Sequence, residues 1–365
     1  MTPTFSGTPV TPPSDADPNA NSPIYAQSYC TLAELDEDLN LQGSEREARV
    51  LPKIKTASDI LQKMIGIFQP VTMTSKYNGH GKPRLYVSPL LSITSIVNED
   101  TTLATTDYIL QPEKRYWPNG PYAWLDVAPE AANLSAWVCK DNGVVLEGKH
   151  GLYELAQSLG ITTGASQAEG ADTLRVSDGS KVSPGMVVLI GTEQEYIEST
   201  STPIGAVTTL GAAIADSEEQ IVTFANGALV NAGEIVRCGV EQMKVTDING
   251  NSAAVIRGWN RTTKSTHAIA ADVDVYRTFN VARGVNGTIA AGHNSGVNIY
   301  KQCVPDDINM LCRKMAGRML KDAQGGFSGV IGDPSAGQAQ YLYIMPKELE
   351  EIRRAYRIVH TARHA

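Results

Sequence analysis

The sequence PDDINMLCRKMAGRMLKDAQGG, from Pro305 to Gly326, carries the clearest helical pattern in the chain. Apolar side chains recur in it at intervals of three and four residues, which places them on one face of a helix. Pro305 suits a first helical turn, and Gly325 can end the helix. A helix with one apolar face needs a partner to cover that face. The core residues that we predict for this helix are Ile308, Leu311, Met315 and Met319.

The length and charge of the chain set broad limits on its function. With 365 residues it is long enough for two or three domains with cores of their own. A formal net charge of -8 argues against a protein built mainly to grip nucleic acid. No apolar run reaches the roughly 18 residues of a membrane span, so we expect no membrane partner. Five scattered cysteines without a C-x-x-C pair indicate reduced thiols. The sequence thus predicts no metal and no cofactor.

The first part of the chain divides into an arm, two helices and a set of strands. Residues 1–24 are rich in Pro, Ser, Thr and Asn and predict a flexible N-terminal arm. Capping boxes at Thr31 and Ser44 predict two helices, which begin there and end near residues 41 and 68. We expect residues 25–160 to form one core, in which the helices are followed by a small antiparallel sheet. The predicted strands lie at 72–77, 84–87, 93–97, 108–110, 122–127, 137–138 and 144–147.

Residues 161–300 contain an internal repeat. The segment 178–194 realigns on 226–242, with three glycines, two valines and the Glu-Gln pair in common. A second match joins Arg257-Gly-Trp-Asn-Arg-Thr262 to Arg283-Gly-Val-Asn-Gly-Thr288. This order predicts two nested small β-barrels or sandwiches, with one unit at about 218–276 inserted between the halves of the other. Two barrels that exchange strands would produce the same order.

The end of the chain returns to helix. We expect residues 301–346 to hold a core helix and a glycine-rich loop, and residues 347–365 a final helix and tail. The predicted fold class is therefore α+β: a helical bundle with a small antiparallel sheet, plus an inserted all-β region of two nested small barrels or sandwiches.

A search for catalytic chemistry finds little. The chain has no phosphate-binding loop, no nucleophile elbow and no H-E-x-x-H zinc motif. Glu193 and Glu241 recur at matched places in the repeat, as do His267 and His293. A carboxylate pair is conceivable, but duplication also copies packing and turn residues, which is the simpler explanation. We therefore predict no catalytic residues and a structural or binding protein.

An ordered series of short motifs carries a resemblance to a known family. The motifs are Tyr29-Cys-Thr-Leu-Ala-Glu-Leu35, Ala57-Ser-Asp-Ile-Leu61, Pro89-Leu-Leu-Ser-Ile-Thr-Ser-Ile-Val97, Asp107-Tyr108, Val144-Val-Leu-Glu-Gly148, Pro305-Asp-Asp-Ile308 and Pro346-Lys-Glu-Leu349. Over 25–155 and 301–363 the chain resembles the head-tail connector (adaptor) proteins of long-tailed bacteriophages. It departs from the short members by the insertion of about 140 residues, which is similar to small β modules of phage virion proteins.

The resemblance implies a place in the virion and a set of partners. Family members form a ring, typically of twelve copies, under the portal protein in the neck of the virion. A tail-completion (stopper) or tail terminator protein docks on the far side, and double-stranded DNA passes through transiently. The protein itself would be made in the host cytoplasm. By resemblance, the residues that bind the portal are Leu349, Ile352, Arg353, Tyr356 and Arg357.

Two other functions are compatible with the sequence. One is a tail or baseplate adhesin whose β modules bind glycans, with Trp259 as the aromatic platform. The other is a wall-degrading enzyme that uses Glu193 or Glu241, which would require two carboxylates converging in a cleft.

Overall fold

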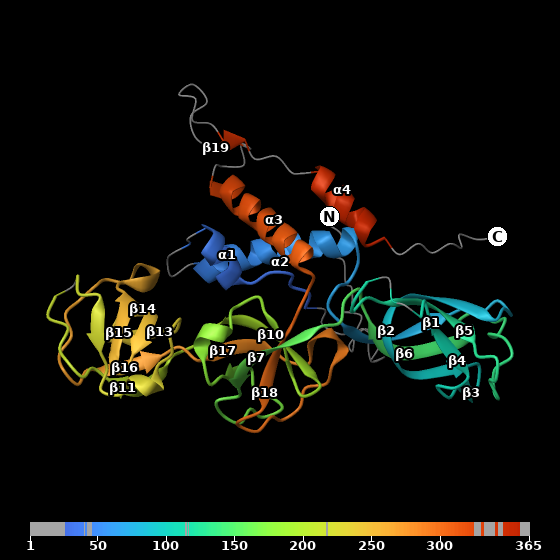
Figure 1. Ribbon diagram of the computed structural model, residues 1–365, viewed down its shortest axis with the longest axis horizontal. Coiled ribbons are helices and arrows are strands. Elements are labelled where there is room, and N and C mark those ends of the chain that lie inside the picture. Colours follow the sequence, from blue (N-terminus) through green and yellow to red (C-terminus); the bar gives the residue numbers. More distant parts are fainter. Residues whose placement is uncertain are drawn as a thin grey trace, which may run out of the picture.

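Three antiparallel sheets of six strands lie in a row, and the helices lie on one side of that row, mainly over the middle sheet (Figure 1). The computed structural model describes residues 26–39, 41, 46–113, 115, 117–216, 218–324, 330–331, 340–341 and 346–357. Strands make up 37% and helices 22% of the residues that the structure describes. The fold class predicted from the sequence is therefore wrong, because the protein is mostly β and its first sheet has as many strands as each of the other two.

The first sheet shows why the sequence led to this error. The segments 84–87 and 93–97 were expected as separate short strands, but both belong to β2, which spans 15 residues. The pairing register of β2 shifts at several points, and these irregularities let the strand continue past Pro89. The strand predicted at 137–138 is absent. Trp137 lies in a loop instead, where its side chain is fully buried and donates a hydrogen bond to the Pro83 carbonyl, 3.2 Å away.

The strand order of the first sheet is β1-β6-β2-β5-β4, with β3 paired to β2. Its strands are β1 (Val71–Tyr77), β2 (Arg84–Asn98), β3 (Thr101–Thr102), β4 (Tyr108–Gln111), β5 (Tyr122–Val127) and β6 (Val144–His150).

The second sheet forms the framework β-domain, in the order β7-β18-β9-β10-β17-β8. Its strands are β7 (Ala156–Thr162), β8 (Thr173–Arg175), β9 (Val187–Ile190), β10 (Glu193–Thr200), β17 (Thr278–Ala282) and β18 (Asn298–Gln302). The third sheet forms the inserted β-domain, in the order β11-β16-β13-β14-β15-β12. Its strands are β11 (Ile204–Thr209), β12 (Ile221–Thr223), β13 (Ile235–Cys238), β14 (Glu241–Asn249), β15 (Ser252–Ile256) and β16 (Asp272–Val275).

These two strand orders are the same once each strand is replaced by its counterpart in the repeat. The inserted β-domain occupies the chain between β10 and β17, and each sheet contains only its own strands. Among the described strands, the pairing thus corresponds to one unit inserted in another and not to an exchange of strands.

Short turns of 3-10 helix also recur in pairs: η1 (Gly179–Lys181) with η2 (Gly227–Leu229), and η3 (Trp259–Arg261) with η4 (Val285–Gly287). In the second pair, Gly258 and Gly284 precede the turn with φ of 63° and 58°. Asn260 and Asn286 follow in the same left-handed region, with φ of 55° and 56°. Glycine and asparagine are the residues that adopt this conformation most readily. The conformation therefore explains why Arg-Gly-x-Asn appears twice in the sequence.

Four helices are described: α1 (Leu32–Leu39), α2 (Arg46–Met64), α3 (Asp306–Gln324) and α4 (Pro346–Ala355). A two-stranded sheet of β19 (Val330–Ile331) and β20 (Gln340–Tyr341) lies between α3 and α4 in the chain. The capping box at Thr31 is confirmed, since its backbone N–H donates to the Glu34 carboxylate at 2.8 Å. Ser44, which would open the second box, lies outside the described residues.

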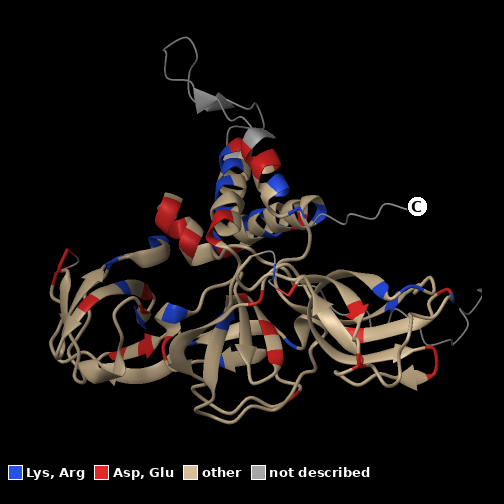
Figure 2. Ribbon diagram, turned by 45° about the vertical axis from the view of Figure 1, so that its right-hand side comes forward, with Lys and Arg blue, Asp and Glu red and all other residues tan. Residues whose placement is uncertain are grey.

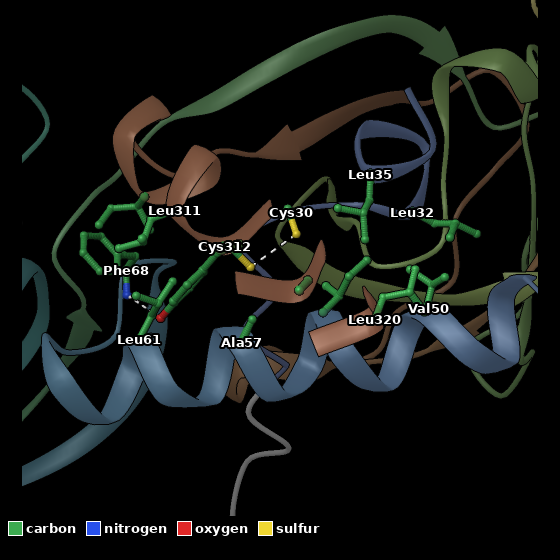
Figure 3. Close-up of a cluster of buried hydrophobic side chains, with 14 of the residues drawn as sticks. Cys30, Leu32, Leu35, Val50, Ala57, Leu61, Phe68, Leu311, Cys312 and Leu320 are labelled. Atoms are coloured by element: carbon green, nitrogen blue, oxygen red, sulfur yellow. Dashed lines mark hydrogen bonds between the residues drawn. The ribbon is translucent and has the colours of Figure 1, made fainter. Parts of the chain in front are cut away.

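The helices share one hydrophobic core, which we call the helical core. Figure 3 shows side chains of α2 (Val50, Ala57 and Leu61) facing side chains of α3 (Leu311, Cys312 and Leu320). The thiols of Cys30 and Cys312 are buried there, with their sulfur atoms 3.2 Å apart. No helix in the described part of the chain is long and apolar enough to cross a membrane.

Candidate functional site

A buried ion cluster holds the loops of the inserted β-domain together. The Glu241 carboxylate, at the start of β14, accepts two hydrogen bonds from the Arg257 guanidinium, at 2.7 and 2.8 Å. It also accepts backbone N–H bonds from Gly258 and Ser265, both at 3.1 Å. Nε2 of His267 lies 2.8 Å from the same carboxylate. The side chains of Glu241 and Arg257 are 0% and 1% exposed, so this pair is shielded from solvent.

The framework β-domain contains the same cluster. Glu193 accepts two hydrogen bonds from Arg283, both at 2.7 Å, and a backbone bond from Gly284 at 3.0 Å. A second backbone bond comes from Ala291 at 2.9 Å, and Nε2 of His293 lies 2.9 Å away. The repeated arginine, glutamate and histidine therefore form one unit, which ties a loop to the start of the equivalent strand in each domain, β10 or β14.

The two glutamates in these clusters are held in the ionised form. Burial alone would raise the pKa of Glu241, but the hydrogen bonds from Arg257 and His267 outweigh it and lower the pKa to about 2. Burial likewise opposes the charge of Glu193, and the hydrogen bonds from Arg283 again bring its pKa below the ordinary value. A carboxylate that is fully paired in this way is a poor proton donor at neutral pH.

One buried carboxylate of the framework β-domain has no equivalent in the inserted β-domain. Glu195 stands where the inserted β-domain has Met243, and its side chain is fully buried. It accepts a hydrogen bond from Gln167 at 3.2 Å and lies 3.1 Å from Nε of Arg283. Burial raises the pKa of Glu195 to about 7, because the Gln167 hydrogen bond and the Arg283 charge offset only part of the desolvation.

The extra carboxylate creates a group with the spacing of metal ligands, which sequence reasoning missed. One ligand atom each of Glu193, Glu195 and His293 lies within 4.8 Å of the others. The Arg283 guanidinium already pairs with both carboxylates, at 2.7 and 3.1 Å, and supplies the positive charge that a metal ion would bring. The available signal was the Glu-x-Glu pattern of β10, but sequence spacing cannot show that His293 lies beside it.

The turn η4 joins the framework β-domain to two distant segments. Oδ1 of Asn286 accepts the backbone N–H of Ala26 at 3.0 Å, and its Nδ2 donates to Gln194 at 2.9 Å. Gln194 in turn donates to the Pro70 carbonyl at 3.0 Å. A Cβ on Gly287 would lie 1.9 Å from the Thr72 carbonyl oxygen, so only glycine permits this approach of η4 to β1.

The core residues predicted for the late helix lie on α3. Ile308 and Leu311 are buried in the helical core, Met315 is partly buried against it, and Met319 is half-buried. Cys312, Ala316 and Leu320 belong to the same core.

The five residues expected to bind a portal protein all lie on or directly after α4, but they divide between two environments. Leu349 is buried in the helical core, and Ile352 and Tyr356 pack against it. The Tyr356 ring meets those of Phe68 and Trp117 edge to face, with centroids 5.1 and 5.2 Å apart. The two cations, Arg353 and Arg357, are exposed.

Comparison of the chain with protein-family models, with curated proteins and with solved structures finds no match of any of the three kinds.

Proposed function

We propose that this protein is a structural virion protein, a head-tail connector that forms a ring between the portal and the tail-side neck proteins. The observation that carries the proposal is the composition of the helical core. The two stretches that resemble connectors, 25–155 and 301–363, are separated in sequence by both β-domains. They nevertheless meet in one hydrophobic cluster, in which Leu61 and Phe68 pack with residues such as Ile308 and Leu349.

The arrangement of the insertion also supports this proposal. The framework and inserted β-domains branch from the chain between Tyr153 and Val304, two residues that both pack against the helical core. A pillar of helices that carries side domains suits a ring, because each subunit then has different surfaces for its two neighbours.

The described geometry offers less support to the two alternatives. Trp259 is only 9% exposed, and Nζ of Lys244 lies 4.7 Å from its ring centroid, so its face is not free to stack on a sugar. Glu193 and Glu241 belong to different sheets, and each is bound within its own ion cluster. They do not converge in the cleft that a two-carboxylate hydrolase requires.

The exposed cations of α4 define the portal contact that we propose. Basic and acidic residues alternate along the ribbons of α3 and α4 (Figure 2). Since Leu349, Ile352 and Tyr356 pack inward, the charged face with Arg353 and Arg357 remains for a partner. In this proposal the inward residues hold α4 in place, and the arginines contact the portal.

Electron microscopy of the purified protein, alone and mixed with the portal protein of the same genome, tests the proposal. We expect rings with a central hole wide enough for double-stranded DNA, either free or on the portal. An Arg353→Glu/Arg357→Glu variant should bind the portal at least about tenfold more weakly, because it reverses two exposed charges at the contact. A Lys55→Glu/Lys140→Glu variant is the control, as it reverses two exposed charges elsewhere. A protein that stays monomeric and does not bind the portal protein would refute the connector function.

A further inference from the structure

A cavity of about 500 Å³ lies where α1, the start of α2, the framework β-domain and the inserted β-domain meet. Its lining includes Asp36, Arg46, Ser180, Lys244, Ile256 and Trp259. A volume of this size could hold many water molecules or a short length of peptide, since one water takes about 30 Å³ in the liquid.

The lining contains polar atoms without partners. Oδ1 of Asp36, Nε of Arg46, Oγ of Ser180 and Nε1 of Trp259 are all buried and make no hydrogen bond with the described chain. Asp36 and Arg46 pair only through their other atoms, at 2.9 Å. Each such buried atom destabilises the fold if it remains unsatisfied. Four residues with this defect around one cavity indicate that a polar occupant completes their hydrogen bonds.

Charges of both signs line the cavity: Asp36 and Glu37 are acidic, and Arg46 and Lys244 are cations. Arg46 pairs with Asp36, so Lys244 is the lining cation with no ion pair among the described residues. Of the unpartnered buried atoms named above, Nε of Arg46 and Nε1 of Trp259 are donors, Oδ1 of Asp36 is an acceptor, and the Ser180 hydroxyl can be either. The occupant should therefore offer carbonyl oxygens to the donors, an N–H or O–H group to Asp36, and a carboxylate to Lys244. An extended segment rich in proline has carbonyls that point outward, and the indole N–H of Trp259 can donate to such a carbonyl.

The N-terminal residues 1–25 have this chemistry. They contain six prolines, and their only charged side chains are Asp15 and Asp17. Asp15 or Asp17 can therefore pair with Lys244 of the cavity.

The repeat supplies an independent reason to choose this segment. In the framework β-domain, Asn286 of η4 holds the backbone of Ala26, which directly follows residues 1–25. The equivalent residue of the inserted β-domain is Asn260, next to Trp259. Its Nδ2 donates to Gln242 at 2.8 Å as Asn286 does to Gln194, but its buried Oδ1 has no partner in the described chain. The side-chain oxygen that accepts the Ala26 N–H in the framework β-domain thus has an equivalent in the inserted β-domain that accepts no hydrogen bond from the described chain.

We propose that this cavity binds the N-terminal segment, residues 1–25, of a neighbouring copy of the chain. The chain's own residues 1–25 are joined to Ala26, and Ala26 lies against η4, where the framework β-domain meets β1. The cavity lies where the framework β-domain meets the inserted β-domain. In the ring that we propose as the function, the arm of each subunit would reach the next one. Only the choice of a neighbouring copy as the source of residues 1–25 rests on the proposed connector function.

A labelled synthetic peptide of residues 1–25 tests the inference. It is titrated into the full-length protein at concentrations at which the protein is monomeric, so that no neighbour's segment fills the cavity, and binding is followed by fluorescence anisotropy. We expect saturable binding that weakens about tenfold or more in Lys244→Glu, because a cation of the site becomes an anion. Trp259→Phe, which keeps the ring but removes the indole N–H, should also weaken it. Lys140→Glu makes the same charge change in the loop between β5 and β6 and should leave binding unchanged. A peptide with Asp15 and Asp17 replaced by lysine should not bind.

Absence of binding, or equal binding to all three variants, would overturn the inference and leave the cavity as a water-filled space. The two proposals can fail separately. Rings on the portal without peptide binding would reject the arm site alone, whereas peptide binding without rings would reject the connector function alone.

Discussion

An Arg283→Met variant is expected to lose about 5 kcal/mol of the stability of the framework β-domain, near the top of the range for breaking a buried ion pair. The substitution would leave Glu193 without its partner inside the protein. It would also leave Glu195 beside it, with no cation between the two carboxylates. Arg257→Met is the matched comparison in the same chain, because it removes the arginine of Glu241 where no second buried carboxylate lies beside that glutamate. Its loss should lie near the lower end of that range, at about 3 kcal/mol.

Hydrogen exchange followed by mass spectrometry is the appropriate measurement, since a chain with several domains does not unfold in one step. In Arg257→Met the loss of protection should be confined to residues 204–275. In Arg283→Met it should appear in 156–200 and 278–302, and it should extend to Ala26 and Gln27 because Asn286 holds them. Unchanged protection in both variants would show that the ion clusters contribute nothing to stability.

A Glu195→Met variant is expected to be more stable than the natural protein above neutral pH. The pKa of Glu195 is raised from 4.5 to about 7 in the folded protein. As the pH rises from 4.5 to 7, the unfolded chain therefore loses this proton before the folded protein does, and stability falls. Above pH 7 the full cost is present, about 3 kcal/mol. Methionine occupies the equivalent position 243 and is fully buried there, so the fold accepts it.

Urea unfolding between pH 4.5 and 8.5, monitored by hydrogen exchange in the framework β-domain, checks this prediction. The natural protein should lose stability relative to Glu195→Met as the pH rises, and the two should converge near pH 4.5. Glu198→Gln serves as the control, because Glu198 is exposed on the same strand. Parallel pH profiles for the natural protein and Glu195→Met would contradict the raised pKa.

The helices could be predicted from local sequence, whereas the balance of the fold could not. The apolar spacing of Ile308, Leu311 and Leu320 predicts α3, and the structure confirms it as Asp306–Gln324. Apolar periodicity reports which face of an element is buried, but not how many neighbours a strand has. The interruption at Pro89 marked an end of a strand in the sequence, although in the sheet it lies within the irregular part of β2.

The ion clusters illustrate the same limit at the level of single residues. The repeat identified Glu193 with Glu241 and His293 with His267, and it favoured structural roles for them. It did not pair either glutamate with Arg283 or Arg257, because those residues are 90 and 16 positions away. Contacts over such distances depend on how the sheets close, which local pattern does not encode.

The position of the inserted β-domain fixes the order in which the parts of the chain become complete during synthesis. The strands of the first sheet are all available once residue 150 has left the ribosome, and those of the inserted β-domain once residue 275 has left. The framework β-domain, although it begins earlier, must wait for β18, and the helical core must wait for α3 and α4. Since domains usually fold as they emerge, we expect the inserted β-domain to fold before the framework β-domain that surrounds it in the sequence. The N-terminal helices α1 and α2 are made first, yet they are among the last to find their partners.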